Sequence, residues 1–171
     1  MKRAAFAIHP TPVGDALLIF SDAGLAALDI IDDGDDVTAL LLGAENRLGM
    51  PVEHDEQAAA AVTTQLDEYF AGERRDFDAL LDLTGTTEFG TRTLEQITRI
   101  PYGQTASYGE IAMRAGKPRA ARAVGSICAT TPISIVVPVH RVVRSDGSVG
   151  QYGRHPEAKA FLLDLEREST D

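Results

Sequence analysis

Residues 135–143 read IVVPVHRVV, an apolar run that ends in a proline and is followed at once by His140 and Arg141. β-branched residues are typical of buried, extended segments. A buried segment that ends in polar side chains holds them at a fixed place, as the floor of an active site does. A reactive side chain is expected between the proline and the histidine, but this position is Val139, which has no lone pair. The stretch predicts a site and leaves open whether that site reacts or only holds a ligand.

The residues before this stretch predict two short helices. Ser107 and Glu110 have the spacing of a capping box, so a helix is expected over 108–115. A three-residue turn that contains a glycine follows, and a second helix is expected over 119–129. This pattern is typical of a helix-turn-helix, whose second helix meets DNA. The second helix is rich in alanine and glycine, which allow either close helix packing or close approach to a DNA groove.

The charge distribution favours the DNA interpretation. The net charge of −10 argues against nucleic acid, but residues 1–87 hold 17 acidic and five basic residues, whereas residues 88–171 hold nine acidic and 11 basic residues. No acidic residue occurs between Glu110 and Asp146. That window contains six cations, namely Arg114, Lys117, Arg119, Arg122, Arg141 and Arg144. Such a segment is typical of a surface that faces phosphates.

The remaining patterns complete an α+β fold. In the second half, helices are expected over 88–100 and 156–168, and a hairpin turn at 145–148 between 142–143 and Val149 would form a wing. In the first half, strands are expected over 4–8, 16–20, 25–31 and 77–83 and a helix over 55–71, with 37–42 of undecided type. The polar link at 84–87 coincides with the reversal of charge. We therefore predict a small sheet-plus-helix domain, 1–84, and a mainly helical winged helix-turn-helix domain, 85–171.

Several classes of site are not expected. Cys128 is the only cysteine, so no disulfide can form within the chain, and the four histidines are too scattered to form a zinc site. We expect no metal and no cofactor. The apolar stretch near the start is too short for a signal peptide, and no run approaches the ~20 apolar residues of a membrane span. A cytoplasmic monomer without a membrane partner is the resulting prediction.

The second half resembles the O6-alkylguanine-DNA alkyltransferases, also called methylated-DNA–protein-cysteine methyltransferases. The matching motifs are IPYG at 100–103 with Thr105, SY at 107–108, ARAVG at 121–125, PxHRV at 138–142, GxYG at 150–153, and Lys159 with 162–163 and Glu166. They cover the whole second half in order, whereas the first half fits the family only in layout.

This resemblance implies roles for individual residues. Arg122 would enter the base stack from the minor groove in place of a flipped guanine, and Tyr108 would crowd the adjoining phosphate. His140 and Glu166 would be the acid–base pair that makes a thiolate through water. The DNA-binding set would be Tyr108, Ala121, Arg122, Ala123, Gly125 and Cys128, to which the charge pattern of the second helix adds Arg119. The pocket for the alkylated base is Pro138, Val139, Val142, Val149, Tyr152 and Gly153.

The chain departs from the family at the reactive position. Val139 stands where the family has its cysteine, and a saturated hydrocarbon is no nucleophile. Thr131 replaces an asparagine that acts as a hinge, while Gly90 and Leu94 stand where glutamine and tryptophan are common. Cys128 is expected to be a small helix residue and not a substitute acceptor.

Three interpretations remain. The first is a non-catalytic protein that binds and flips O6-alkylguanine in double-stranded DNA and marks it for a repair-pathway protein. The alternative is a methylated-DNA–protein-cysteine methyltransferase that carries an inactivating Cys-to-Val substitution at Val139. The third is an interaction protein that has lost its DNA role.

Overall fold

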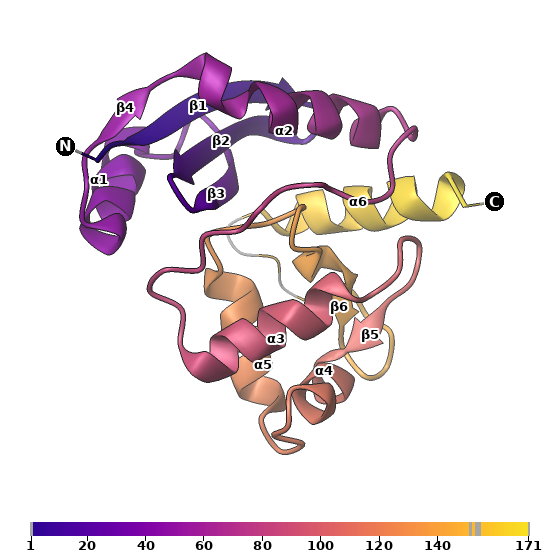
Figure 1. The fold of residues 1–171 in the computed structure, drawn as a ribbon. Coiled ribbons are helices and arrows are strands. Elements are labelled where there is room, and N and C mark those ends of the chain that lie inside the picture. Colours follow the sequence, from indigo (N-terminus) through magenta and orange to yellow (C-terminus); the bar gives the residue numbers. More distant parts are fainter. Residues whose placement is uncertain (1, 151, 153–154, 171) are drawn as a thin grey trace. The chain divides into compact units, whose positions relative to one another are not determined.

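A computed structural model describes residues 2–150, 152 and 155–170, which form two units, Met1–Gly85 and Thr86–Asp171 (Figure 1). Within the described residues, no helix has the length and apolar character needed to cross a membrane.

The first unit is a four-stranded sheet in the order β3-β2-β1-β4. Strands β1, Ala4–Thr11, β2, Gly14–Ser21, and β3, Gly24–Ile31, are antiparallel, and β4, Val52–His54, runs parallel to β1. The predicted strands over 4–8, 16–20 and 25–31 are confirmed. Gly24 begins β3 with φ 139°, and a Cβ there would lie 2.3 Å from a backbone oxygen, so only glycine fits this turn.

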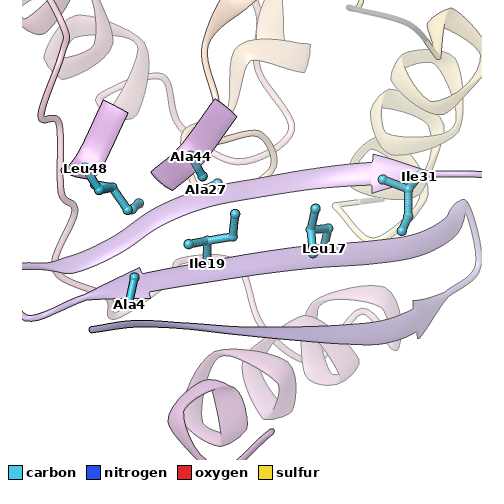
Figure 2. Packing of buried hydrophobic residues seen from close by; sticks show 8 residues of the cluster. Ala4, Leu17, Ile19, Ala27, Ile31, Ala44 and Leu48 are labelled. Atoms are coloured by element: carbon cyan, nitrogen blue, oxygen red, sulfur yellow. The ribbon is translucent and has the colours of Figure 1, made fainter. Parts of the chain in front are cut away.

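Two helices bury the faces of this sheet. Helix α1, Val37–Leu48, places Ala44 and Leu48 on the face of the sheet that carries Ile19 of β2 and Ala27 of β3, as Figure 2 shows. Leu18 points to the opposite face and is equally buried, which requires a second cover. Helix α2, Glu56–Phe70, lies along β1 and β2 and confirms the helix expected over 55–71.

Two features of this unit differ from the sequence prediction. Residues 37–42 open helix α1, because the Asp36 carboxylate accepts a hydrogen bond from the Ala39 N–H at 3.0 Å and caps it. Residues 77–83 form no strand: the backbone makes only an isolated bridge between Leu25 and Leu81. The Asp82 carboxylate accepts hydrogen bonds from the Ser21 hydroxyl and from the Thr84 N–H, and the extended run ends at this turn.

The second unit consists mainly of helices. Helices α3, Glu88–Thr98, α4, Tyr108–Arg114, α5, Ala121–Thr130, and α6, Pro156–Glu168, occur where helices were predicted. A short 3-10 helix, η1, spans Val139–Arg141. Helix α5 begins two residues later than expected, because the Ala120 N–H donates to the Lys117 carbonyl and extends the turn after α4. The α+β fold with an N-terminal sheet and a helical second unit is therefore confirmed.

The predicted wing hairpin is wrong in its pairing. The turn at 145–148 forms, with the Arg144 N–H donating to the Ser148 carbonyl at 3.0 Å. However, strand β6, Val142–Val143, pairs in parallel with β5, Ala106–Ser107, and Val149 lies outside any strand. The Val142 carbonyl accepts from the Lys159 Nζ at 2.6 Å, so a side chain and not a hairpin strand satisfies this group.

The capping box at the start of α4 gives a first testable prediction. The Ser107 hydroxyl accepts from the Glu110 N–H at 3.0 Å, and the Glu110 carboxylate accepts from the Ser107 N–H at 3.1 Å. Ser107→Ala should lower the free energy of unfolding by about 1 kcal/mol. Urea unfolding followed by circular dichroism measures this, with Ser126→Ala on the exposed face of α5 as the control. Equal stability of the two variants would show that the cap contributes nothing.

Candidate active site

The apolar run of residues 135–143 forms tight turns instead of a strand. Ile135 has φ 65°, which is unusual for a β-branched residue, and the Val136 N–H donates across it to the Ser134 carbonyl at 2.7 Å. A second three-residue turn, closed by the Val139 N–H and the Val137 carbonyl at 2.7 Å, leads directly into η1. The positive φ of Ile135 costs about 1–3 kcal/mol and persists only where the surroundings hold it. These turns place residues 139–141 in the interior of the second unit.

The side chains that follow the turns form one buried ionic network. The His140 Nε2 lies 2.7 Å from the Glu166 Oε1, and these side chains are 0% and 1% exposed. Arg141 donates from Nε to Glu166 Oε2 and from Nη2 to Glu166 Oε1, each at 2.9 Å. The Gly103 N–H also reaches Glu166 Oε2 at 3.3 Å. The predicted pairing of His140 with Glu166 is present beside Val139.

The network fixes the charges of its members. Burial alone would raise the pKa of Glu166, but hydrogen bonds from His140 and Arg141 outweigh it and lower this pKa to about 2. Burial lowers the pKa of His140, against the opposing effect of Glu166. At neutral pH the site therefore combines an ionised Glu166 with a neutral His140. An ionised carboxylate only accepts hydrogen bonds, so Nε2 carries the ring hydrogen and Nδ1 has none.

Lys159 belongs to the same region, although its place in the family motif predicted no role for it. Its Nζ donates to the Val142 carbonyl at 2.6 Å and to the Tyr108 hydroxyl at 3.5 Å. Burial lowers its pKa to about 8. Gly150 has φ 73°, which favours glycine, and a Cβ there would lie 2.9 Å from the Tyr108 hydroxyl, so Gly150 borders Tyr108 closely. The available signal was a lysine on the apolar face of α6, one turn before Leu162, since buried lysine is rare.

Most of the predicted DNA-binding residues lie on or beside α5. Arg119, Arg122 and Ala123 are exposed, whereas Ala121, Gly125 and Tyr108 are half-buried. A Cβ on Gly125 would lie 4.0 Å from the Tyr108 ring, so these two residues are neighbours. Exposed arginine side chains next to small residues allow a DNA groove to approach this helix closely.

Two of the residues predicted to face DNA are instead buried. Cys128 is 7% exposed, so it cannot belong to the exposed face of α5, and burial raises its thiol pKa to about 12. Arg141 is 5% exposed and bound to Glu166, so it cannot contact phosphates. The other five cations of the acid-free window remain exposed.

The residues predicted to form the pocket differ in burial, and the predicted hinge residue makes only a weak contact. Buried members of the pocket are Pro138, Val139, Val142 and Tyr152, while Val149 is exposed and Gly153 lies outside the described residues. The Thr131 hydroxyl accepts from the Ile133 N–H at 3.5 Å, which is the limit of a hydrogen bond. Thr131 thus ties α5 to the next segment more weakly than a shorter hydrogen bond would.

Comparisons with known proteins agree with this geometry. Residues 5–83 match the family model of the 6-O-methylguanine DNA methyltransferase ribonuclease-like domain, and residues 88–168 match that of the DNA binding domain. A methylated-DNA–protein-cysteine methyltransferase of Mycobacterium leprae is 40% identical over 92% of this chain and 88% of its own. The O6-methylguanine methyltransferase of Mycobacterium tuberculosis has a crystal structure with a TM-score of 0.82 and 36% identity, covering 97% of this chain and 94% of its own. A structure of the M. tuberculosis OGT in complex with DNA has a TM-score of 0.81 and 35% identity, covering 98% of this chain and 94% of that one.

These relatives correct the first functional interpretation. Proteins that match both halves of the chain are named methyltransferases, so the prediction of a non-catalytic damage-recognition protein is wrong, and its alternative is better supported. The first half also matches the family in sequence and not only in layout. With both halves matched and the buried His140–Glu166 pair in place, the chain belongs to the methylated-DNA–protein-cysteine methyltransferase family.

Proposed function

We propose that this chain is a methylated-DNA–protein-cysteine methyltransferase, built for direct removal of alkyl groups from O6 of guanine in DNA, with an inactivating valine at the acceptor position. The single observation that carries the proposal is the buried His140–Glu166 contact of 2.7 Å directly beside Val139. A buried acid–base pair costs free energy to maintain and is useful where a neighbouring residue must lose a proton.

The reaction requires a sulfur at position 139. A thiol there would pass its proton toward Nδ1 of His140, and the sulfur would attack the alkyl carbon. The new S–C bond forms as the C–O6 bond breaks, and the bonding pair leaves with guanine, which takes up a proton. Lys159 beside Tyr108 is a nearby source of that proton, because its pKa of about 8 lies close to neutrality. With Val139 at this position, the reaction lacks the sulfur that would accept the alkyl group.

Cys128 does not replace that acceptor. Its thiol has a pKa of about 12 and is therefore almost wholly protonated at neutral pH. The network of His140, Arg141 and Glu166 is anchored to the residues that follow position 139 and not to α5. Restoring the thiol with Val139→Cys and following the loss of O6-methylguanine from a duplex is accordingly the test of the proposed reaction.

Lesion recognition is tested separately at Arg122. Arg122→Ala should weaken binding to a duplex with O6-methylguanine by about tenfold or more and binding to the undamaged duplex much less, because flipping a base costs a few kcal/mol that an inserted side chain offsets. Fluorescence anisotropy at one fixed salt concentration measures both affinities. Arg114→Ala, which removes another exposed arginine, should weaken both complexes alike. An equal loss on both duplexes for Arg122→Ala would reduce this residue to a phosphate contact.

A further inference from the structure

The hydrogen bonds that the structure gives the Arg141 side chain all go to groups inside the protein. Nε and Nη2 hold the two oxygens of Glu166, and Nη1 donates to the Ile100 carbonyl at 2.7 Å. The guanidinium carbon also lies 5.6 Å from the centre of the Tyr102 ring. A bidentate contact fixes both the position and the rotation of the carboxylate. The side chain of Glu166 therefore has one orientation, the one that meets His140.

Arg141 also changes the charge that His140 experiences. The described charged groups that act on this imidazole are Glu166 and Lys159 from α6 and Arg141 itself. Glu166 favours a protonated ring, whereas Arg141 and Lys159 oppose it. Because the Arg141 cation already neutralises Glu166, the carboxylate keeps its hydrogen bond to His140 but loses much of its power to attract a second positive charge.

We propose that Arg141 is a positioning residue for alkyl transfer: by clamping Glu166 it fixes the Nε2–H form of His140 and keeps the ring neutral, with Nδ1 as its basic atom. This inference deepens the proposed function and rests on it for its purpose. A neutral ring is the form that can take a proton from a thiol. A protonated ring could not do so.

The inference can be tested in the chain as it exists, with Val139 in place. NMR of the 15N-labelled protein gives the ring tautomer and the pH titration of His140. In Arg141→Gln the pKa of His140 should shift upward, because a nearby cation is lost. In Arg141→Lys the cation remains but the bidentate clamp is lost. The Nε2 hydrogen of His140 should then exchange with solvent at least tenfold faster than in the parent, at a nearly unchanged pKa.

Arg167→Gln is the matched control, since Arg167 follows Glu166 in α6 but is exposed and pairs with Asp164. It should leave the His140 titration and exchange unchanged. An unchanged His140 in both Arg141 variants would overturn the inference. If Arg141→Gln does not fold, the exchange rate in Arg141→Lys decides alone, and parental exchange contradicts the clamp.

Failure of the proposed function has a different signature. In the Val139→Cys background, Arg141→Gln should move the pH profile of methyl transfer, whereas a purely structural role would lower transfer equally at every pH. If Val139→Cys transfers no methyl group while the NMR changes occur as described, the reaction is refuted and the positioning role of Arg141 stands.

Discussion

Glu166→Gln should lower the free energy of unfolding by about 3–5 kcal/mol at neutral pH, because it leaves the buried Arg141 cation without its anion. The carboxylate receives hydrogen bonds from Arg141, His140 and the Gly103 N–H, and an amide oxygen can replace few of them. Urea unfolding followed by circular dichroism measures the loss. Glu168→Gln on the exposed side of the same helix removes the same charge and should change stability by less than about 0.5 kcal/mol.

The same carboxylate predicts a window of acid sensitivity. Its pKa in the folded protein is about 2, below the ordinary value of 4.5, so its contribution is complete above pH 4.5 and is lost as the pH falls toward 2. The difference of pKa corresponds to roughly 3 kcal/mol. The parent should therefore lose stability relative to Glu166→Gln across this window. Parallel pH curves for the two proteins would contradict the ionised state assigned to Glu166.

The sequence predicted the elements whose signals are local. The Ser107 and Glu110 spacing placed the start of α4, and the apolar period placed α6 at Pro156–Glu168. The buried partner of His140 was predicted too, but only through the family motif that contains Glu166. No local pattern connects two residues that are 26 positions apart.

What the sequence could not predict depends on tertiary contacts. Arg141 was counted among the exposed cations, because nothing in its neighbourhood reveals that α6 brings Glu166 to it. Cys128 was placed on the DNA face because the family resemblance implied it, whereas in this chain the residue is only 7% exposed and is therefore buried. The turns at Ile135 and Pro138 were not predicted, because a run of β-branched residues favours a strand, and only tertiary packing holds Ile135 at its positive φ.

Val139→Cys should convert a protein without methyl transfer into one that accepts a single methyl group. The substitution replaces one small side chain by another of similar size, so the buried site should tolerate it. The new thiol would lie next to His140, whose neutral ring can take its proton. Val139→Ser is the matched control: a hydroxyl is far harder to ionise than a thiol, and we expect no transfer.

The role of the acid–base pair is tested in the same background. Adding His140→Ala to Val139→Cys should slow transfer by about 10²–10⁴-fold, the usual contribution of general base catalysis. Single-turnover kinetics with a methylated duplex in excess measure the rate. Equal rates with and without the histidine would show that the pair has no part in the reaction.

The central claim is that one residue separates this chain from a working methyltransferase, and the mass of the protein after exposure to O6-methylguanine DNA tests it most directly. The Val139→Cys protein should gain the mass of one methyl group in place of one hydrogen, located by fragmentation on the peptide that contains position 139. The parent chain should gain nothing, at Cys128 or elsewhere. An unmodified Val139→Cys protein, or a methyl group on Cys128, would contradict the account.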